Sequence, residues 1–397
     1  MGSLWESESD WAWLPMNLFD MILYKLVSLA DYVRFGAVCK SWQSVAMDNK
    51  VQFFENKGCR QVPFLMVPSQ DDSHQERRSL YNIINNKLFD FQVRVPYKKR
   101  LSGSSHGWLF TVEESFGLTL INPFSGATIE LPPIINRSEY EYQEIINMGY
   151  TKPPDVEFKV MKAILSADPV SSPGDYIISA IYSDCKSLAF IQPGDRAWTY
   201  IDKDRLRFSL ILDVIFYKGQ ILAVDGFNRI IMVDLNRRVR ESKAPQVQVI
   251  APPTNLQSER NYLVESSSGD LLLVHRNIDY DLPDLQHTTF DFKVFKVLLQ
   301  KTDKKVWAKR VEVNNLGGDT MFLGDNHSIC VSASKWPGCQ PNSIYYTDDY
   351  IDIKLHPLHG RRDLGIFNVE NGNFGMHYSL DPSHKHMPPS IWIVPSI

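Results

Sequence analysis

Residues 214–233 read VIFYKGQILAVDGFNRIIMV and contain three short apolar runs separated by two polar breaks. The runs are rich in β-branched and aromatic residues, which favour a pleated, half-buried strand, so their succession predicts an antiparallel meander. Similar runs recur along the chain at 62–67, 79–83, 88–93, 108–112, 118–121, 176–181, 188–191, 198–201, 262–265, 271–274, 292–297, 321–323, 344–346 and 366–369. No long helical period interrupts this series, which predicts a mainly β fold.

The length of the series predicts how the strands are arranged. Residues 62–397 would make an unusually large sandwich, whereas radial repetition in a β-propeller leaves only short, protected strand edges. A four-stranded blade takes roughly 40–50 residues. We therefore predict a β-propeller of about six blades, near residues 62–95, 101–135, 158–203, 208–252, 260–315 and 319–377. The run 391–394 is predicted to supply a strand that closes the ring on the first blade.

The beginning of the chain has a different period. Between Trp13 and Trp42, large apolar residues recur at helical spacing, as in Leu18, Ile22 and Leu26, and three short helices are predicted. Pro15 suits a first helical position, where its missing N–H costs nothing. A segment of this length rarely folds alone and cannot bury so much apolar side chain within itself. The surplus predicts a partner surface.

These residues resemble an F-box, the helical module of ubiquitin-ligase substrate receptors. The matching positions are Leu14-Pro15-x-x-Leu18, Ile22-Leu23-x-x-Leu26, Asp31 and Val38-Cys39-Lys40-x-Trp42. Two positions depart from the pattern, because Tyr32 replaces the usual Leu and Gln43 a frequent Arg. The resemblance implies that the module docks on the small adaptor subunit of a cullin-based SCF ligase. The expected adaptor-binding residues are Leu14, Pro15, Leu18, Ile22, Leu23, Leu26, Val38, Cys39 and Trp42.

The predicted propeller also resembles a family, by the order of its motifs. Residues 262–266, 271–274, 322–324, 344–346 and 365–367 are similar to a plant family of F-box proteins with a kelch-like propeller domain of unassigned function. Kelch and WD repeat signatures themselves are weak or missing. The predicted organisation is an F-box at residues 10–48, a linker at 49–61 and a propeller at 62–397.

Composition excludes several classes of function. The 397 residues are 44% hydrophobic and 22% charged with a net charge of −4, which gives no reason to expect nucleic acid as a partner. The polar first ten residues do not form a secretory signal, and no apolar run reaches the ~20 residues of a membrane helix. Five scattered cysteines do not form a disulfide framework, so we expect a reduced compartment, the cytoplasm or nucleus.

The remaining motifs predict no catalytic or metal site and no cofactor. Residues 103–107, GSSHG, satisfy the nucleophile-elbow pattern, but without α/β alternation a turn before the Trp108 strand is the better interpretation. The acidic stretch 277–284 lacks the Gly and Glu of a calcium loop and is interpreted as a solvated loop. The pairs His356/His359 and His384/His386 lack cysteines at zinc-site spacing. The basic clusters 98–100 and 237–240 are interpreted as solvated faces.

Together these features predict a non-enzymatic substrate receptor. Its F-box would bind the adaptor and, through it, the cullin, while its propeller holds a target protein for ubiquitin transfer by other subunits. Two alternatives remain: a scaffold or inhibitor that acts without ubiquitin transfer, and a propeller-based enzyme. Trp336, Arg361 and Arg362 are weak candidates for target contacts, because Trp and Arg dominate interface hot spots.

Overall fold

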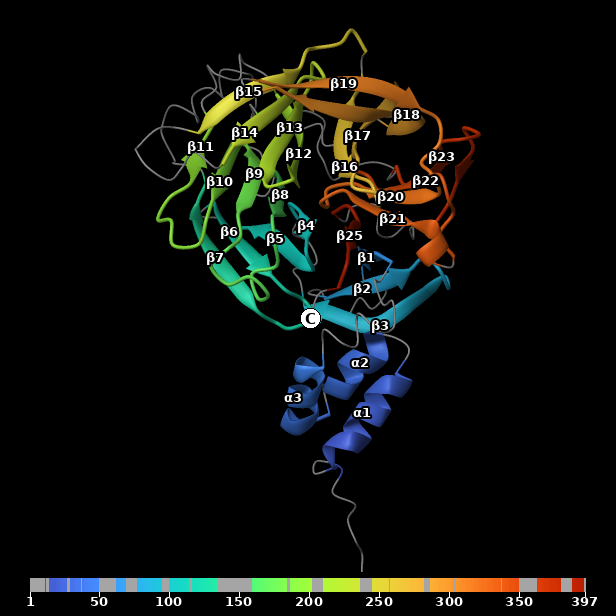
Figure 1. Ribbon diagram of the computed structural model, residues 1–397. Helices are drawn as coiled ribbons and strands as arrows, with labels where there is room; N and C mark the ends of the chain where they lie inside the picture. The colour runs from blue at the N-terminus through green and yellow to red at the C-terminus, as the bar shows by residue number, and fades with distance from the viewer. Residues whose placement is uncertain are drawn as a thin grey trace, which may run out of the picture. The chain divides into compact units, whose positions relative to one another are not determined.

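The computed structural model divides the chain into two compact units, Met1–Gln61 with Ile397, and Val62–Ser396 (Figure 1). The structure describes residue 11 and residues 14–26, 29–36, 38–49, 62–68, 77–94, 100–113, 116–134, 159–183, 186–201, 210–235, 245–256, 258–281, 286–302, 305–336, 338–349, 363–379 and 388–395. The predicted linker therefore lies outside the described residues, apart from Asn49. Within the described residues, no helix is long and apolar enough to cross a membrane.

The described part of the first unit is helical. It contains α1 (Met16–Lys25), α2 (Leu29–Gly36) and α3 (Lys40–Asp48). Pro15 lies one position earlier than predicted, just before α1, with φ −57° and ψ 142°, and its carbonyl accepts the Leu18 N–H at 2.9 Å. A proline is tolerated there because an N–H at a helix start has no partner within the helix. At the other end, Leu26 is extended and stops α1.

The second unit is a six-bladed β-propeller, which confirms the predicted fold class. Its blades surround a common axis, and the first three blades are antiparallel sheets of four strands (Figure 1). From the axis outward, blade 1 consists of β25 (Ile391–Ile393), β1 (Phe64–Pro68), β2 (Arg77–Asn82) and β3 (Lys87–Arg94). Blade 2 consists of β4 (Ser104–Ser105), β5 (Trp108–Val112), β6 (Gly117–Ile121) and β7 (Thr128–Pro133). Blade 3 consists of β8 (Val160–Leu165), β9 (Ile178–Tyr182), β10 (Ser187–Ile191) and β11 (Thr199–Tyr200).

Blades 4 and 5 repeat this pattern, whereas blade 6 departs from it. Blade 4 consists of β12 (Ile211–Tyr217), β13 (Gln220–Asp225), β14 (Ile230–Asp234) and β15 (Gln246–Ala251), and blade 5 of β16 (Arg260–Glu265), β17 (Leu271–Asp281), β18 (Gln286–Lys301) and β19 (Val306–Val313). Blade 6 has the strand order β21 (Ile329–Ser332), β20 (Asp319–Leu323), β22 (Ser343–Tyr346), β23 (Gly365–Asn368) and β24 (Phe374–Gly375). A short 3-10 helix, η4 (Ala333–Lys335), follows β21. Because β20 pairs with β22 in parallel, the prediction of antiparallel meanders throughout is wrong for this blade.

The two ends of the propeller sequence meet in blade 1. Strand β25 pairs antiparallel with β1, with Leu65 opposite Trp392, which confirms the predicted closing strand. Both side chains are fully buried and belong to one apolar cluster that also includes Phe322 and Tyr345 of blade 6. The ring is therefore closed by backbone pairing within blade 1 and by apolar packing between blades 1 and 6.

The GSSHG motif lies where blades 2 and 3 approach each other most closely. A Cβ on Gly103 would lie 2.1 Å from the carbonyl oxygen of Ala163, so only glycine fits. Ser105 Oγ accepts the Leu165 N–H at 3.1 Å, and His106 and Gly107 form the turn between β4 and β5. The motif therefore joins two blades, and its serine is engaged by the backbone of the neighbouring blade.

Two expectations about charged segments are wrong. Residues 277–281 are not a solvated loop, because β17 and β18 form one long hairpin that continues through them. Arg100 does not lie on a solvated face: it is fully buried, and its charge is balanced by Asp325 at 2.8 Å. The neighbouring lysines of that cluster and the arginines at 237–240 lie outside the described residues.

Candidate functional site

The three helices enclose a small core of their own. Phe19 and Leu23 of α1, Tyr32 and Phe35 of α2, and Val45 and Ala46 of α3 are buried in it. The hydroxyl of Tyr32 donates a hydrogen bond to the Ala46 carbonyl, which joins α2 to α3, and burial raises the pKa of Tyr32 to about 12. The tyrosine that departs from the F-box pattern is therefore accommodated by a backbone partner.

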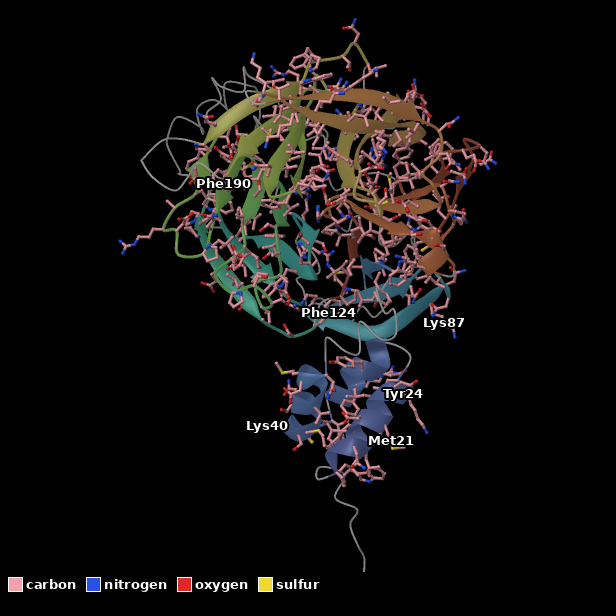
Figure 2. All side chains as sticks on the ribbon, viewed as in Figure 1. Met21, Tyr24, Lys40, Lys87, Phe124 and Phe190 are labelled. Carbon is pink, nitrogen blue, oxygen red and sulfur yellow. The ribbon has the colours of Figure 1, made fainter. Side chains whose placement is uncertain are left out.

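A second apolar surface of the helical unit faces solvent. Met21 is 56% exposed and Tyr24 is 78% exposed, and Figure 2 shows both side chains projecting from α1. The apolar residues Trp11, Met16, Leu18 and Val38 are also exposed. A groove of about 180 Å³ runs along this side of α1 and is lined by Trp11, Leu14, Leu18, Met21, Ile22 and Lys25. These exposed apolar side chains make this side of α1 the candidate binding surface of the helical unit.

Trp42 connects the core to this groove. Its ring packs 4.5 Å from Phe35 and 5.3 Å from Phe19, measured between centroids. Its indole N–H donates a 2.8 Å hydrogen bond to the carbonyl of Trp11, one of the groove residues. Trp42 is only partly buried, and it thereby holds the segment that precedes α1 against the module.

The structure places some of the predicted adaptor-binding residues together along the groove, and it buries others fully or in part. Leu14, Leu18 and Ile22 line the groove, and Pro15 and Val38 are exposed. Leu26, Cys39 and Trp42 are partly buried. Leu23 is only 4% exposed, so its side chain stabilises the module's core and is not free to meet a partner. The F-box pattern does not identify Trp11, Met16, Met21 or Tyr24. Their apolar character is visible in the sequence, and Met21 and Tyr24 lie on the other side of α1 from Phe19.

The helical unit exposes apolar side chains, whereas the propeller buries a set of charged side chains near its axis. Arg276 of β17 is fully buried and contacts Asp349 Oδ1 and Asp363 Oδ2, each at 3.0 Å. It also donates hydrogen bonds to the Thr347 carbonyl at 2.9 Å and to Thr289 Oγ1 at 2.7 Å. One arginine of blade 5 thus holds two segments of blade 6, and its charge is balanced by two carboxylates.

Further ion pairs link other blades. Arg100, just before blade 2, pairs with Asp325 of blade 6 and donates to the carbonyls of Val160 and Met161 in blade 3. Burial raises the pKa of the Asp325 carboxyl to about 6, although Arg100 opposes this shift. Buried charges are tolerated only when such partners are present.

Two β-bulges position the third pair. The register of β8 shifts between Val160 and Lys162, and that of β12 shifts between Ile211 and Asp213, so each strand contains one extra residue. Bulges of this kind redirect the side chains that follow them. Here they bring Lys162 Nζ to 2.5 Å from Asp213 Oδ1, which joins blades 3 and 4.

These charged groups leave little space between them. The cavity that they line measures about 20 Å³ and is bordered by Lys162, Asp213, Arg260, Asp325 and Asp349. That is room for roughly one water molecule. Within the described residues, no group of three or more His, Cys, Asp or Glu side chains could hold a metal ion. The arrangement can hold blades 2 to 6 in register, and the space between these groups is too small for an organic substrate.

The structure tests one of the three weak target candidates. Trp336 follows η4 and is 8% exposed, because it packs in the apolar cluster between blades 1 and 6. As a target contact this prediction is wrong, since the side chain fills an interior position. Arg361, Arg362 and the histidine pairs at 356/359 and 384/386 lie outside the described residues.

The fold defines a β-propeller protein that carries a separate N-terminal helical module with an exposed apolar groove. The family model described as KIB1-4 beta-propeller matches residues 80–368, and the chain belongs to this family. The predicted kelch-like character stays a prediction.

Curated relatives from Arabidopsis thaliana cover both units. The F-box protein SKIP23 is 24% identical over 97% of this chain and 95% of its own length. The F-box protein At2g17036 is 25% identical over 98% of this chain and 95% of its own length. The chain is therefore homologous, along nearly its whole length, to plant proteins named as F-box proteins.

Proposed function

We propose that this protein is the substrate-recognition subunit of an SCF-type E3 ubiquitin ligase. The α1 groove docks the adaptor subunit, which connects the protein to the cullin, and the propeller holds a target protein. The observation that carries the proposal is the exposed apolar groove on a module that already has its own complete core. The F-box names of the relatives support it.

In this mechanism the protein itself breaks no bond. Binding of a target places its lysines near a ubiquitin-charged enzyme, which raises their effective concentration at the reacting centre. The rigid, ion-paired centre of the propeller suits this task because it keeps the loops of the blades at fixed positions. The proposed compartment is the cytoplasm or nucleus. There the cysteines of this chain stay reduced and the other subunits of the ligase are present.

The test measures adaptor binding by the full chain. The double variant Leu18→Ala, Met21→Ala removes two groove side chains that are exposed, so the fold should persist. Interface anchors typically contribute more than 1 kcal/mol each, so we expect binding to weaken at least tenfold in a calorimetric titration with purified adaptor. Ubiquitin transfer in a reconstituted ligase should fall in parallel.

Met47→Ala is the matched control, because Met47 is an exposed methionine on α3 that does not line the groove. It should bind the adaptor as the unchanged chain does. If the unchanged chain fails to bind, or if the double variant and the control bind equally well, the proposal is wrong.

A further inference from the structure

On one sheet face of the propeller, apolar side chains are left exposed by the part of the chain that the structure describes. On β18 and β19, Leu298 pairs with Lys309, and Trp307 and Val311 lie two positions from Lys309 on either side, so all four side chains share one face. Trp307 is 45% exposed, and Leu298 and Val311 are exposed as well. We call Leu298, Trp307, Lys309 and Val311 the blade 5 patch.

The patch continues a face that is buried nearer the axis. Val294 and Val313 are paired on the same face and pack against Phe367 of blade 6 in one apolar cluster. The packing of blade 6 against this face ends further from the axis, because the outermost strand of blade 6, β24 (Phe374–Gly375), contains only two residues. The blade 5 patch is thus the part of an inter-blade face that no described strand of blade 6 covers.

A short outer strand alone does not leave such a patch. The outer strand of blade 3, β11, also contains two residues, yet it covers blade 2. Trp198 Nε1 donates to the Pro132 carbonyl at 2.9 Å, and Tyr200 Oη donates to the Ile134 carbonyl at 3.1 Å. In the described residues of blade 6, no comparable pair of aromatic side chains reaches β19.

Positive side chains predominate around the patch, because the one exposed carboxylate among the described residues of β18 and β19, Glu312, lies on the opposite face. Lys301, Lys305 and Lys309 are exposed, and none of them forms an ion pair with another described residue. Lys296, on the patch face, is already paired with Asp270 at 2.6 Å. This positive region belongs to a chain whose net charge is −4, so it is a local feature and not a general property of the surface.

We propose that the blade 5 patch binds an acidic segment of a target protein that carries apolar anchor residues. This inference rests on the proposed function and specifies the surface on which the target is held. Trp307 is the central anchor, Leu298 and Val311 extend the apolar contact, and Lys309 pairs with an acidic residue of the target. The exposed lysines at the end of the hairpin speed association with a negatively charged segment.

The first experiment selects peptides from a random phage-displayed library on the immobilised full chain. We expect enrichment of peptides that combine Asp or Glu with Leu, Ile or Phe. The enriched peptide is then synthesised and titrated. Trp307→Ala and Lys309→Glu should each weaken its binding at least tenfold, and the corresponding peptide with lysine in place of its acidic residues should not bind.

Lys87→Glu is the matched control, since Lys87 is an exposed lysine of the outer strand of blade 1 (Figure 2). It should change binding less than twofold. The urea unfolding midpoint of the propeller should be unchanged in all three variants, which shows that they are folded. Adaptor binding, measured on the same preparations, should also be unchanged, which separates this proposal from the proposed function.

Several outcomes would overturn the proposal. One is enrichment of peptides without acidic residues, or binding that Trp307→Ala and Lys309→Glu leave intact. Another is self-association of the chain that Trp307→Ala abolishes, which would make a second copy the occupant. A third is binding of phosphatidylserine vesicles or RNA through the same residues while no acidic peptide binds.

Discussion

Apolar side chains are usually buried and charged side chains are usually exposed, and each unit of this protein departs from one half of this rule. The helical module exposes large apolar side chains although its own core is complete, and the propeller buries charged side chains, among them Arg276 and Arg100, that are paired with carboxylates. Exposed apolar groups have no structural role in the isolated module, so they indicate a binding surface. Buried ion pairs fix the relative position of elements, so they indicate a rigid support. Six substitutions test this contrast.

The largest effect should come from Arg276→Ala. It removes a buried cation, which leaves Asp363 without its ion-pair partner and Asp349 with Arg260, 3.9 Å away, and breaking such a pair typically costs about 3–5 kcal/mol. We expect urea unfolding, followed by intrinsic fluorescence, to show a strongly destabilised propeller. A loss below about 1 kcal/mol would mean that the buried charges are not needed for rigidity.

The next comparison lies within α1. Leu23→Ala opens a cavity in the module's core and should lower the free energy of unfolding of this unit by about 2–5 kcal/mol. Met21→Ala, in the same helix but exposed, should leave stability nearly unchanged and weaken adaptor binding. Thermal unfolding by circular dichroism and a binding titration separate the two effects. Equal destabilisation by both would show that the groove belongs to the core.

Acid should weaken the propeller through its buried histidines. Burial lowers the pKa of His275 and of His377 to about 4, whereas an unfolded histidine has a pKa of about 6.5. Between these values the unfolded chain binds protons that the folded chain does not, so stability falls as pH falls, by up to about 1.4 kcal/mol per unit and group. Denaturant midpoints measured from pH 7 to 5 should decrease, and less steeply in His275→Leu.

His287 should show the opposite dependence. Burial alone would lower its pKa, but the hydrogen bond and charge of Asp348, 2.9 Å away, outweigh burial and raise it. Its contribution is complete below pH 6.5 and is lost as pH rises through the raised value. His287→Gln should therefore destabilise the protein more at pH 6 than at pH 8. The reverse order would contradict the ion pair.

The smallest effect belongs to an exposed pair of charges. Arg34 Nη1 lies 3.3 Å from Asp31 Oδ1 on the surface of α2, where both side chains are solvated. Exposed pairs of this kind contribute at most about 0.5 kcal/mol, so Arg34→Ala should not change the thermal midpoint measurably. A clear loss would show that surface charge also supports the module.

Local patterns predict part of this structure and miss the rest for identifiable reasons. Alternating apolar runs and their turns predict the six blades and the closing strand, because both depend on neighbours in sequence. The parallel pairing of β20 with β22 depends on which strands meet in space. Buried charges such as Arg276 look like surface residues, since their partners Asp349 and Asp363 are far away in sequence.

The sequence predicts only some of the residues that line the groove on α1, and the reason is different. Helix α1 has apolar residues on nearly all sides, so periodicity alone does not separate the face toward the core, with Phe19 and Leu23, from the face toward solvent, with Leu18 and Met21. The family pattern names Leu18 and Leu23 together, although the structure places them in different environments.

The meeting of β25 with β1 has a consequence for synthesis of the protein. β25 follows the other described strands of the propeller in sequence, so a nascent chain cannot close the ring before residues 391–393 have been synthesised. The helical module, with its own core, is complete much earlier and is ready to fold first. A premature stop codon that removes only the last strand would release a chain with an intact docking groove and an open propeller.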